Sequence, residues 1–407
     1  MEVIKQKYKQ TEVGIIPIDW KSVSFTECAD IKHGFQFREE HFTNRGIKII
    51  KIGNLKYSGE LDLDKITYTS FENLSKFSNF LLKKGDVLMA LTGATLGKSS
   101  IVKTNEPLLQ NYRVGNFLNK SNVSKEFLYY IVQSDFIQKN INKLVNEAAQ
   151  PNLGKQDFHN FIFPLPPTLK EQTAIATALS DTDAWINSLE QLLTKKRQIK
   201  QGAMQELLQP KKGWEVSTIK QVANFRRGSF PQPYGLDKWY DDYNGMPFVQ
   251  VYDVDDNKKL KVDTKRKISI AGSKFSVFVE KGSVIITIQG SIGRIAITQY
   301  DAYVDRTLLI FESFNVKFDK YFFVTMIELL FEKEKEKAPG GIIKTITKEA
   351  LSSFEITYPD FEEQTRIATI LSDMDEEIGQ LESKLEKAKQ LKQGMMQELL
   401  TGRIRLV

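Results

Sequence analysis

The sequence predicts an α+β protein with two similar lobes, each built on a twisted, mostly antiparallel sheet, and two long antiparallel coiled-coil helices. Three features predict this fold: a duplicated helical motif, a heptad pattern through both copies, and short strand-like runs between them. We expect a first lobe at 1–167, a central helix at 168–209, a second lobe at 210–359 and a C-terminal helix at 360–407. The two halves should be related by a pseudo-two-fold axis.

The duplicated motif is the clearest feature of the chain. EQTAIATALSDTD at 171–183 returns as EQTRIATILSDMD at 363–375, and KQGAMQELL at 200–208 returns as KQGMMQELL at 392–400. Both pairs have one offset, because 363 − 171 and 392 − 200 both equal 192. A repeat period this long indicates two copies of a whole unit rather than a stack of small repeats.

Both copies of the motif have the pattern of a long helix. Apolar residues recur at spacings of four and three, as in a coiled-coil seam. Thr168 with Glu171, and Asp360 with Glu363, have the spacing of helix caps. Two such helices in one chain can pair with each other, and we prefer this arrangement to homodimerisation. The predicted interhelix residues are Ile175, Leu179, Ile186, Leu189, Leu193, Ile367, Leu371, Ile378, Leu381 and Leu385.

Composition limits the class of protein. A chain of 407 residues with 41% hydrophobic content can bury two ordinary cores. The single cysteine, Cys28, excludes a disulfide framework and suits a reducing cytoplasm. We find no signal peptide and no long apolar run, so we expect a cytoplasmic protein with no membrane partner.

The charge of the chain is unevenly distributed. The first lobe has 22 basic and 17 acidic side chains and the second has 23 and 19, which gives +5 and +4. The helices at 168–209 and 360–407 have charges of 0 and −3. Basic lobes joined by a neutral spacer are typical of nucleic-acid binding, although many other proteins have lobes of similar charge.

The lobes are also related to each other, more distantly. GIKIIKIGN at 46–54 aligns with GMPFVQVYD at 245–253, and the glycine-rich segment 83–102 aligns with 280–298. Because the lobes differ at most other positions, we expect that, as nucleic-acid-binding lobes, they would bind two different nucleotide sequences.

Together these features resemble the DNA-specificity subunit of type I restriction–modification enzymes over essentially the whole chain. YKQTEVGIIPIDW at 8–20 resembles the family's first segment, LLTGRIRL at 399–406 its tail, and the duplicated helices its two repeat regions. The resemblance implies two target-recognition domains that read the halves of a split double-stranded DNA site. It also implies partners: two methyltransferase subunits with S-adenosylmethionine, and restriction subunits that use ATP and Mg²⁺ where they exist.

Candidate DNA contacts lie in corresponding loops of both lobes. Lys98 and Arg294 follow glycine turns and could approach phosphates, whereas a hairpin that only needs glycine explains the same pattern. Other candidates have side chains that pair with base edges, for which a solvated sheet edge is the alternative. Further candidates lie in basic and aromatic loops, whose aromatics could instead close the core, or end a predicted strand. These residues are Lys32, Gln36, Arg38, Lys51, Asn54, Gln110, Tyr112, Arg113, Arg226, Arg227, Ser229, Gln250, Asp253, Asp305 and Arg306.

The sequence favours a non-catalytic protein that binds no cofactor or metal itself. GATLGKS at 93–99 is one residue short of a nucleotide-binding loop, and the three histidines are scattered. Two alternatives stay open: a coiled-coil scaffold or orphan adaptor whose lobes bind proteins, and a self-sufficient methyltransferase or nuclease. Selection from random duplexes and a methyl-transfer assay distinguish them.

Overall fold

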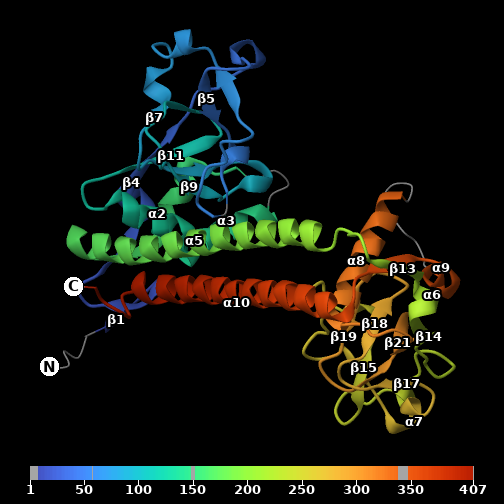
Figure 1. Cartoon of the computed structure of the whole chain (residues 1–407). Coiled ribbons are helices and arrows are strands. Elements are labelled where there is room, and N and C mark those ends of the chain that lie inside the picture. Colours follow the sequence, from blue (N-terminus) through green and yellow to red (C-terminus); the bar gives the residue numbers. More distant parts are fainter. Residues whose placement is uncertain (1–7, 57, 148–151, 338–346, 407) are drawn as a thin grey trace. The chain divides into compact units, whose positions relative to one another are not determined.

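A computed structural model describes residues 8–56, 58–147, 152–337 and 347–406. The chain forms two compact units. One contains the chain up to Glu190 together with the residues from Lys384 onward, and the other is Gln191–Ser383. Each unit contains one lobe and parts of both long helices (Figure 1).

The two long helices are α5 (Leu169–Leu207) and α10 (Phe361–Leu399), close to the predicted ranges. Both predicted caps are present: the Glu171 N–H donates to Thr168 Oγ1 at 3.2 Å, and the Glu363 N–H donates to Asp360 Oδ1 at 2.9 Å. α10 ends at Leu399 rather than continuing to 407, since the chain turns at Gly402, whose φ is +71°.

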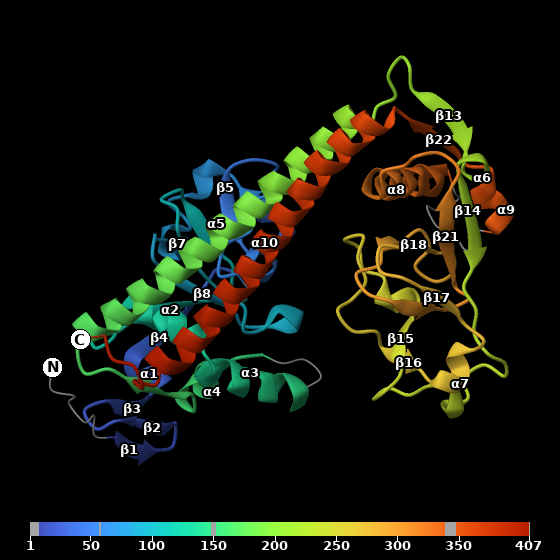
Figure 2. The ribbon, with the colours of Figure 1, turned by 60° about the horizontal axis from the view of Figure 1, so that its bottom comes forward.

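The helices are antiparallel neighbours within each unit (Figure 2). In the first unit Asp183 pairs with Lys392 and Glu190 with Lys389, so residue numbers rise on one helix as they fall on the other. In the second unit Lys196 pairs with Glu377 at 2.6 Å in the same sense. This confirms the predicted antiparallel arrangement.

Nine of the ten predicted interhelix residues are buried, and Leu385 is half-buried. Those near the start of each helix pack into a lobe. Ile175 and Leu179 belong to the core of the first lobe, together with Leu399 from the end of α10. Ile367 and Leu371 belong to the core of the second lobe. The seam prediction was incomplete, because each helix start also completes a lobe core.

The first lobe contains two four-stranded sheets and a strand pair. The sheet nearer α5, which we call the inner sheet, has the order β4-β11-β8-β9 (Figure 1). The sheet farther from α5, the outer sheet, has the order β6-β5-β10-β7. The strands are β4 (Ala29–His33), β11 (Val114–Asn119), β8 (Val87–Ala90), β9 (Ser99–Ile101), β6 (Thr67–Thr69), β5 (Ile47–Ile50), β10 (Leu108–Gln110), β7 (Leu81–Leu82), and the pair β12 (Ile162–Leu165) with β3 (Lys21–Ser24). A hairpin, β1 (Tyr8–Thr11) and β2 (Gly14–Pro17), precedes them.

The second lobe repeats the two sheets and the β3–β12 pair strand for strand, and only the β1–β2 hairpin has no counterpart among its described strands. Its sheets have the orders β14-β21-β18-β19 and β16-β15-β20-β17, and β13 pairs with β22. The strands are β14 (Ala223–Arg227), β21 (Leu308–Phe314), β18 (Val284–Thr287), β19 (Ile295–Ile297), β16 (Arg266–Ile268), β15 (Met246–Val249), β20 (Ala302–Val304), β17 (Val277–Val279), β13 (Glu215–Thr218) and β22 (Glu355–Tyr358). The predicted alignments at β5/β15 and β8/β18 are therefore confirmed.

Helices cover the inner sheets. The first lobe contributes α1 (Phe25–Cys28), α2 (Lys125–Gln133), α3 (Asp135–Glu147) and α4 (Lys155–His159). The second contributes α6 (Ile219–Val222), α8 (Lys320–Lys337) and α9 (Lys348–Ser352), whereas α7 (Ile270–Ser273) follows β16 and lies beside the outer sheet. Among the described strand pairs only β5–β10 and β15–β20 are parallel, so the sheets are mostly antiparallel as predicted.

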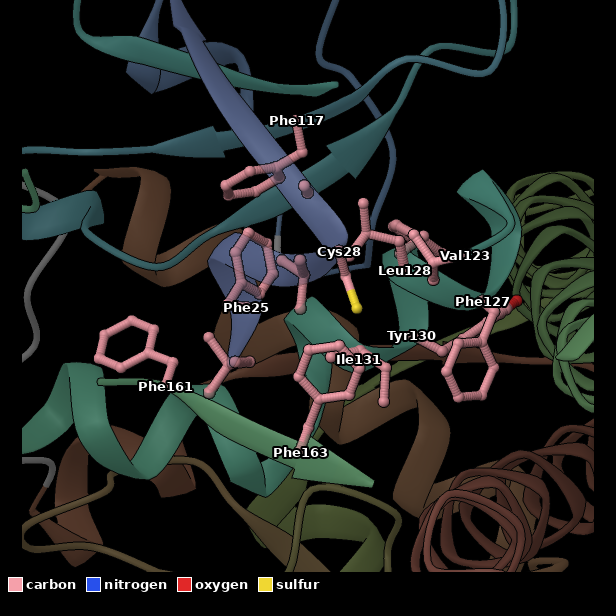
Figure 3. Packing of buried hydrophobic residues seen from close by; sticks show 14 of the residues in the cluster. Phe25, Cys28, Phe117, Val123, Phe127, Leu128, Tyr130, Ile131, Phe161 and Phe163 are labelled. Carbon is pink, nitrogen blue, oxygen red and sulfur yellow. The ribbon is translucent and has the colours of Figure 1, made fainter. Parts of the chain in front are cut away.

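The core of the first lobe is rich in phenylalanine (Figure 3). The Phe25 ring lies edge-on to Phe117, with centroids 5.0 Å apart, and also contacts Phe163. Cys28 is fully buried in this cluster, and burial raises the pKa of its thiol to about 11. Cys28 is therefore a core residue with an unreactive thiol.

Candidate nucleic-acid interface

The predicted loops of the first lobe meet at one edge. β5 and β10 are parallel, so their carboxyl ends lie side by side. The Asn111 N–H donates to Ile50 O at 3.0 Å, and the Phe35 N–H donates to Gln110 O at 2.9 Å. Gly34 allows this contact, because a Cβ there would lie 2.1 Å from Gln110 O. Three loops far apart in sequence thus converge.

The second lobe builds the same edge from equivalent backbone contacts. The Asp305 N–H donates to Val249 O and the Ser229 N–H to Val304 O, both at 3.0 Å. Gly228 takes the place of Gly34, since a Cβ there would lie 2.3 Å from Asp305 O. The loops after β14, β15 and β20 therefore converge as their counterparts do.

A fourth loop completes each edge. In the first lobe the Leu91 N–H donates to Arg113 O, and in the second the Ile288 N–H donates to Thr307 O, both at 3.0 Å. This fourth loop is the glycine-rich segment that carries Lys98 or Arg294. We call each set of four converging loops the recognition edge of its lobe: 34–38, 50–54, 91–98 and 110–113 in the first, and 228–235, 250–254, 288–294 and 305–307 in the second.

Two predicted contacts have structural roles within the edge. Asn54 Oδ1 accepts from the Lys51 N–H at 2.9 Å, and Asp253 Oδ2 accepts from the Gln250 N–H at 2.8 Å. Asn54 and Asp253 are buried, and burial raises the pKa of Asp253. Both side chains cap the short turn after a strand, so the sequence pattern at these positions reflects the turn.

Gln110 and Asp305 also point into their lobes, and each is 1% exposed. Gln110 Nε2 donates to the carbonyls of Lys32 and Val114 at 2.8 and 2.7 Å. Asp305 Oδ1 accepts from the N–H of Thr307 at 2.9 Å and from its hydroxyl. These side chains shape the β10 and β20 turns rather than facing solvent.

The exposed candidates of the first lobe surround the edge. Gln36, Arg38 and Arg113 are exposed, and Arg113 Nε donates to the Tyr112 hydroxyl at 2.6 Å. Lys51 is half-buried with its ammonium 4.1 Å from the Phe42 ring centroid, and burial lowers its pKa. Lys32 Nζ donates to Asn79 O.

The second lobe presents arginine and tyrosine at its edge. Arg226, Arg227 and Arg306 are exposed, and the Arg306 guanidinium lies 5.0 Å from the Tyr234 ring centroid. Gln250 Nε2 donates to the Tyr234 hydroxyl at 3.2 Å, and Gln250 Oε1 accepts from the Tyr252 hydroxyl. A further candidate, Ser229, donates its hydroxyl to Phe275 O at 2.6 Å.

Sequence reasoning missed two cations beside this cluster. The Arg266 guanidinium lies 3.8 Å from the Tyr240 ring centroid, and the Lys265 ammonium lies 4.9 Å from that of Tyr252. Their only sequence signature is the basic run TKRK at 264–267, which by itself is also typical of a solvated strand.

Lys98 and Arg294 have different surroundings. Arg294 Nε lies 2.8 Å from Asp256 Oδ1, and its guanidinium also donates to Val254 O. Lys98 lines a groove of about 610 Å³ between the lobe and α10, together with Lys139 and Arg403. The lobes therefore place these two equivalent cations differently.

The glycines beside these cations are needed for packing as well as for the turn. Gly97 and Gly293 have φ values of +82° and +84°. A Cβ at Gly97 would lie 3.1 Å from Ile141 on α3, and one at Gly293 would lie 2.5 Å from Phe331 on α8. Close approach of a helix is thus one reason for glycine here.

The described residues contain no group of three or more histidine, cysteine, aspartate or glutamate residues arranged to hold a metal ion. None of their helices has both the length and the apolarity needed to cross a bilayer.

The chain matches the family described as the type I restriction modification DNA specificity domain twice, at residues 17–201 and 211–391. The MjaVIII specificity subunit of Methanocaldococcus jannaschii is 33% identical over 183 residues, which cover 44% of this chain and 43% of that protein. The chain thus spans under half of that relative. The putative MjaX specificity subunit of the same organism is 24% identical and covers 99% of this chain and 97% of that protein.

Solved structures share the fold. The S subunit of a type I restriction–modification system from M. genitalium superposes with a TM-score of 0.65 at 15% identity, covering 97% of this chain and 98% of that one. A chain from a type I R-M system studied for complex assembly and conformational transition gives 0.56 at 17% identity, covering 96% and 99%. Two tandem lobes of matching topology are thus the fold that this chain shares with those S-subunit structures. The chain belongs to the type I restriction modification DNA specificity domain family and contains two such domains.

Proposed function

We propose that the chain is the DNA-recognition subunit of a type I restriction–modification complex and reads a split, asymmetric site, one half with each lobe. One observation carries the proposal: the two lobes build the same four-loop edge on equivalent backbone contacts but present different side chains there. Because the two edges share one backbone arrangement, we expect them to bind the same kind of ligand. Because their side chains differ, we expect each edge to prefer a different DNA sequence.

The composition of the exposed residues supports DNA as that ligand. Arg38 and Arg113 in the first lobe, and Arg226, Arg227 and Arg306 in the second, are exposed on or beside the edges. Arginine binds phosphates and also guanine edges in a bidentate manner. Tyrosines beside the arginines of the second lobe can stack on bases or the sugar–phosphate backbone.

We further propose that catalysis belongs to partner subunits and that this chain binds no cofactor. Two methyltransferase subunits would supply S-adenosylmethionine, and restriction subunits, where the system has them, would use ATP and Mg²⁺. The duplicated motif of α5 and α10 supports this stoichiometry, because pseudo-two-fold helices offer two similar docking surfaces.

Selection from random duplexes tests the proposal. The chain is co-expressed with its methyltransferase subunits, and bound DNA is recovered and sequenced. We expect two short, different words separated by a constant number of unspecified base pairs. Enrichment of one uninterrupted word contradicts the split site, and absence of any enriched word favours a protein-binding scaffold.

A methyl-transfer assay tests the division of labour. The purified chain alone is incubated with labelled S-adenosylmethionine and a selected duplex, and the complex serves as the positive control. We expect label in DNA only with the complex. Methyl transfer or cleavage by the chain alone contradicts the assignment of catalysis to partners.

A further inference from the structure

Lys258 in the second lobe has an unusual backbone conformation. Its φ is +60°, and it is the one residue other than glycine with positive φ in the described part of the chain. Glycine adopts this left-handed conformation freely, whereas lysine rarely does. The side chain is also buried, with 6% of its surface exposed. A buried lysine in a disfavoured conformation suggests a specific role.

The Lys258 ammonium is buried and lies in a partly exposed ionic cluster. Its Nζ is 2.9 Å from Glu328 Oε2 on α8 and 3.7 Å from Asp375 Oδ2 on α10. Asp375 also pairs with Lys200 on α5 and accepts from the Tyr321 hydroxyl. One loop of the second lobe is thereby tied to α10 directly and to α5 through Asp375. A buried charge such as that of Lys258 is costly unless it is paired.

The same loop continues from the recognition edge. It follows the turn capped by Asp253, and its Asp256 pairs with Arg294 of the glycine-rich edge loop at 2.8 Å. The Ile297 N–H donates to Lys258 O at 3.1 Å, which joins this loop to the strand after Arg294. The loop 254–260 therefore connects the recognition edge to the helix pair.

The first lobe shows that the turn itself does not need a lysine. Gly59 occupies the equivalent position: the Ile101 N–H donates to its carbonyl at 3.1 Å, and its φ is +83°. A Cβ at Gly59 would lie 1.7 Å from the Tyr129 hydroxyl oxygen, so a tyrosine from α2 fills this space. The lysine of the second lobe thus replaces the residue that the turn prefers.

We propose that Lys258 is a positioning residue, which locks the recognition edge of the second lobe onto the helix pair and so fixes the gap between half-sites that the complex accepts. The inference rests on the proposed split-site function. Adding one base pair to the gap moves a half-site by about 3.4 Å and turns it by about 35° around the duplex. A lobe held by the paired charge of Lys258 resists that movement, and a lobe that pivots on its helices tolerates it.

The test compares wild type with K258G, which removes the ammonium and gives the turn its favoured residue. The control is K259A, which removes a neighbouring charge from an exposed position. Each protein is assembled with its methyltransferase subunits, and binding is measured to the selected site with the gap unchanged or altered by one base pair. Wild type and K259A should bind DNA with an altered gap about tenfold more weakly than DNA with the unchanged gap, whereas for K258G the loss should be about threefold or less.

Two outcomes overturn the inference: unchanged gap selectivity in folded K258G, or equal loss of affinity at every gap, which indicates only a structural role. E328Q keeps the side-chain shape and provides a second variant, with gap selectivity expected between the other two. Thermal unfolding confirms folding of each protein. If wild type selects no split site, the proposed function fails instead, so the two failures are distinguishable.

Discussion

Lys200 on α5 forms an ion pair with Asp375 on α10, and the repeat-related Lys392 and Asp183 form the same pair with the helices exchanged, at 2.6 Å. Each copy of the duplicated motif therefore carries one half of two reciprocal contacts. The acidic end of EQTAIATALSDTD meets the KQG segment of the other copy, and the acidic end of EQTRIATILSDMD does the same in return. The two blocks that the repeat shares are complementary to each other.

Each aspartate also receives a tyrosine hydroxyl from its lobe. Tyr130 on α2 donates to Asp183 Oδ2 at 2.9 Å, and Tyr321 on α8 donates to Asp375. Burial and the nearby carboxylates raise the pKa of both tyrosines, so each hydroxyl stays protonated and can donate. The aspartates thus join helix to helix and helix to lobe.

The first prediction concerns the Lys200–Asp375 pair. Their side chains are 17% and 31% exposed, so water screens the pair only in part. Replacing either residue with alanine should reduce the free energy of unfolding by about 2 kcal/mol, and a double-mutant cycle should give a coupling energy of about 1–2 kcal/mol. Urea denaturation measures both. The control pair Arg197–Glu382 is 59% and 36% exposed and should couple by about 0.5 kcal/mol or less; equal coupling in both cycles contradicts the prediction.

The second prediction concerns the pH dependence of Asp375. Burial alone would raise its pKa, but hydrogen bonds from Lys200 and Tyr321 and the charge of Lys258 hold it below 3.8. A carboxyl with a lowered pKa stabilises the fold fully above its unfolded value and loses this contribution as the pH falls through its folded value. Below about pH 4 wild type should therefore lose stability more steeply than D375N. Urea midpoints between pH 3 and 6 measure this, and parallel curves contradict it.

The third prediction concerns the C-terminal tail. Arg405 donates to Asp19 at 2.9 and 3.0 Å and to Glu171, which is 1% exposed. Removing the guanidinium leaves a buried carboxylate unpaired, so R405A should destabilise the first unit by about 3 kcal/mol. R405K should recover only part of this, because lysine cannot make the bidentate contacts. R403A, which removes an exposed arginine, is the control in thermal and urea unfolding. If R405A lowers the free energy of unfolding as little as R403A does, the ion pairs of Arg405 do not stabilise the first unit.

The fourth prediction separates the half-sites. Arg113 and Arg306 lie on the recognition edges of different lobes, each beside a tyrosine. Arg113→Ala should relax the sequence enriched in one half-site, and Arg306→Ala should relax the other. The loss of discrimination should be about 1–3 kcal/mol at the affected base pair. Selection with each variant complex measures this. Equal relaxation of both halves would falsify the one-lobe, one-half assignment.

The sequence predicted the repeated architecture well, because helix caps and heptad spacing are local and the offset of 192 appears twice. It also aligned β5 with β15 and β8 with β18 correctly. The strand order could not be predicted, since the pairing of β4 with β11 joins residues 82 to 90 positions apart through contacts that no local pattern records. The predicted helix to residue 407 was wrong after Leu399. The tail there is held by contacts of Arg405 with Asp19 and Glu171, which lie far away in sequence and leave no local pattern.

The sequence predicted which segments form the candidate site, but it did not predict which of their side chains face solvent. The proposed loops converge, yet polar residues beside turns serve two purposes that look alike in sequence. Asn54 and Asp253 cap turns, whereas Arg113 and Arg306 face solvent. The segment DDNKKL at 255–260 gives no sign of a special role for Lys258, because adjacent lysines beside aspartate and asparagine are typical of an exposed turn. Only its φ and its burial against α8 and α10 distinguish it from Lys259.

The last prediction concerns the helix pair as a spacer. Seven residues inserted into each helix, between the Glu190–Lys389 and Lys196–Glu377 pairs, preserve the heptad pattern and the register on both sides. At 1.5 Å per residue the insertion adds about 10 Å, which corresponds to about three base pairs of duplex. The selected site should keep both words while its gap lengthens by about that amount. Inserting seven residues into α5 alone is the control, because it breaks the reciprocal pairing and should abolish the split site. An unchanged gap in the double insertion contradicts the helix pair as the element that sets the spacing.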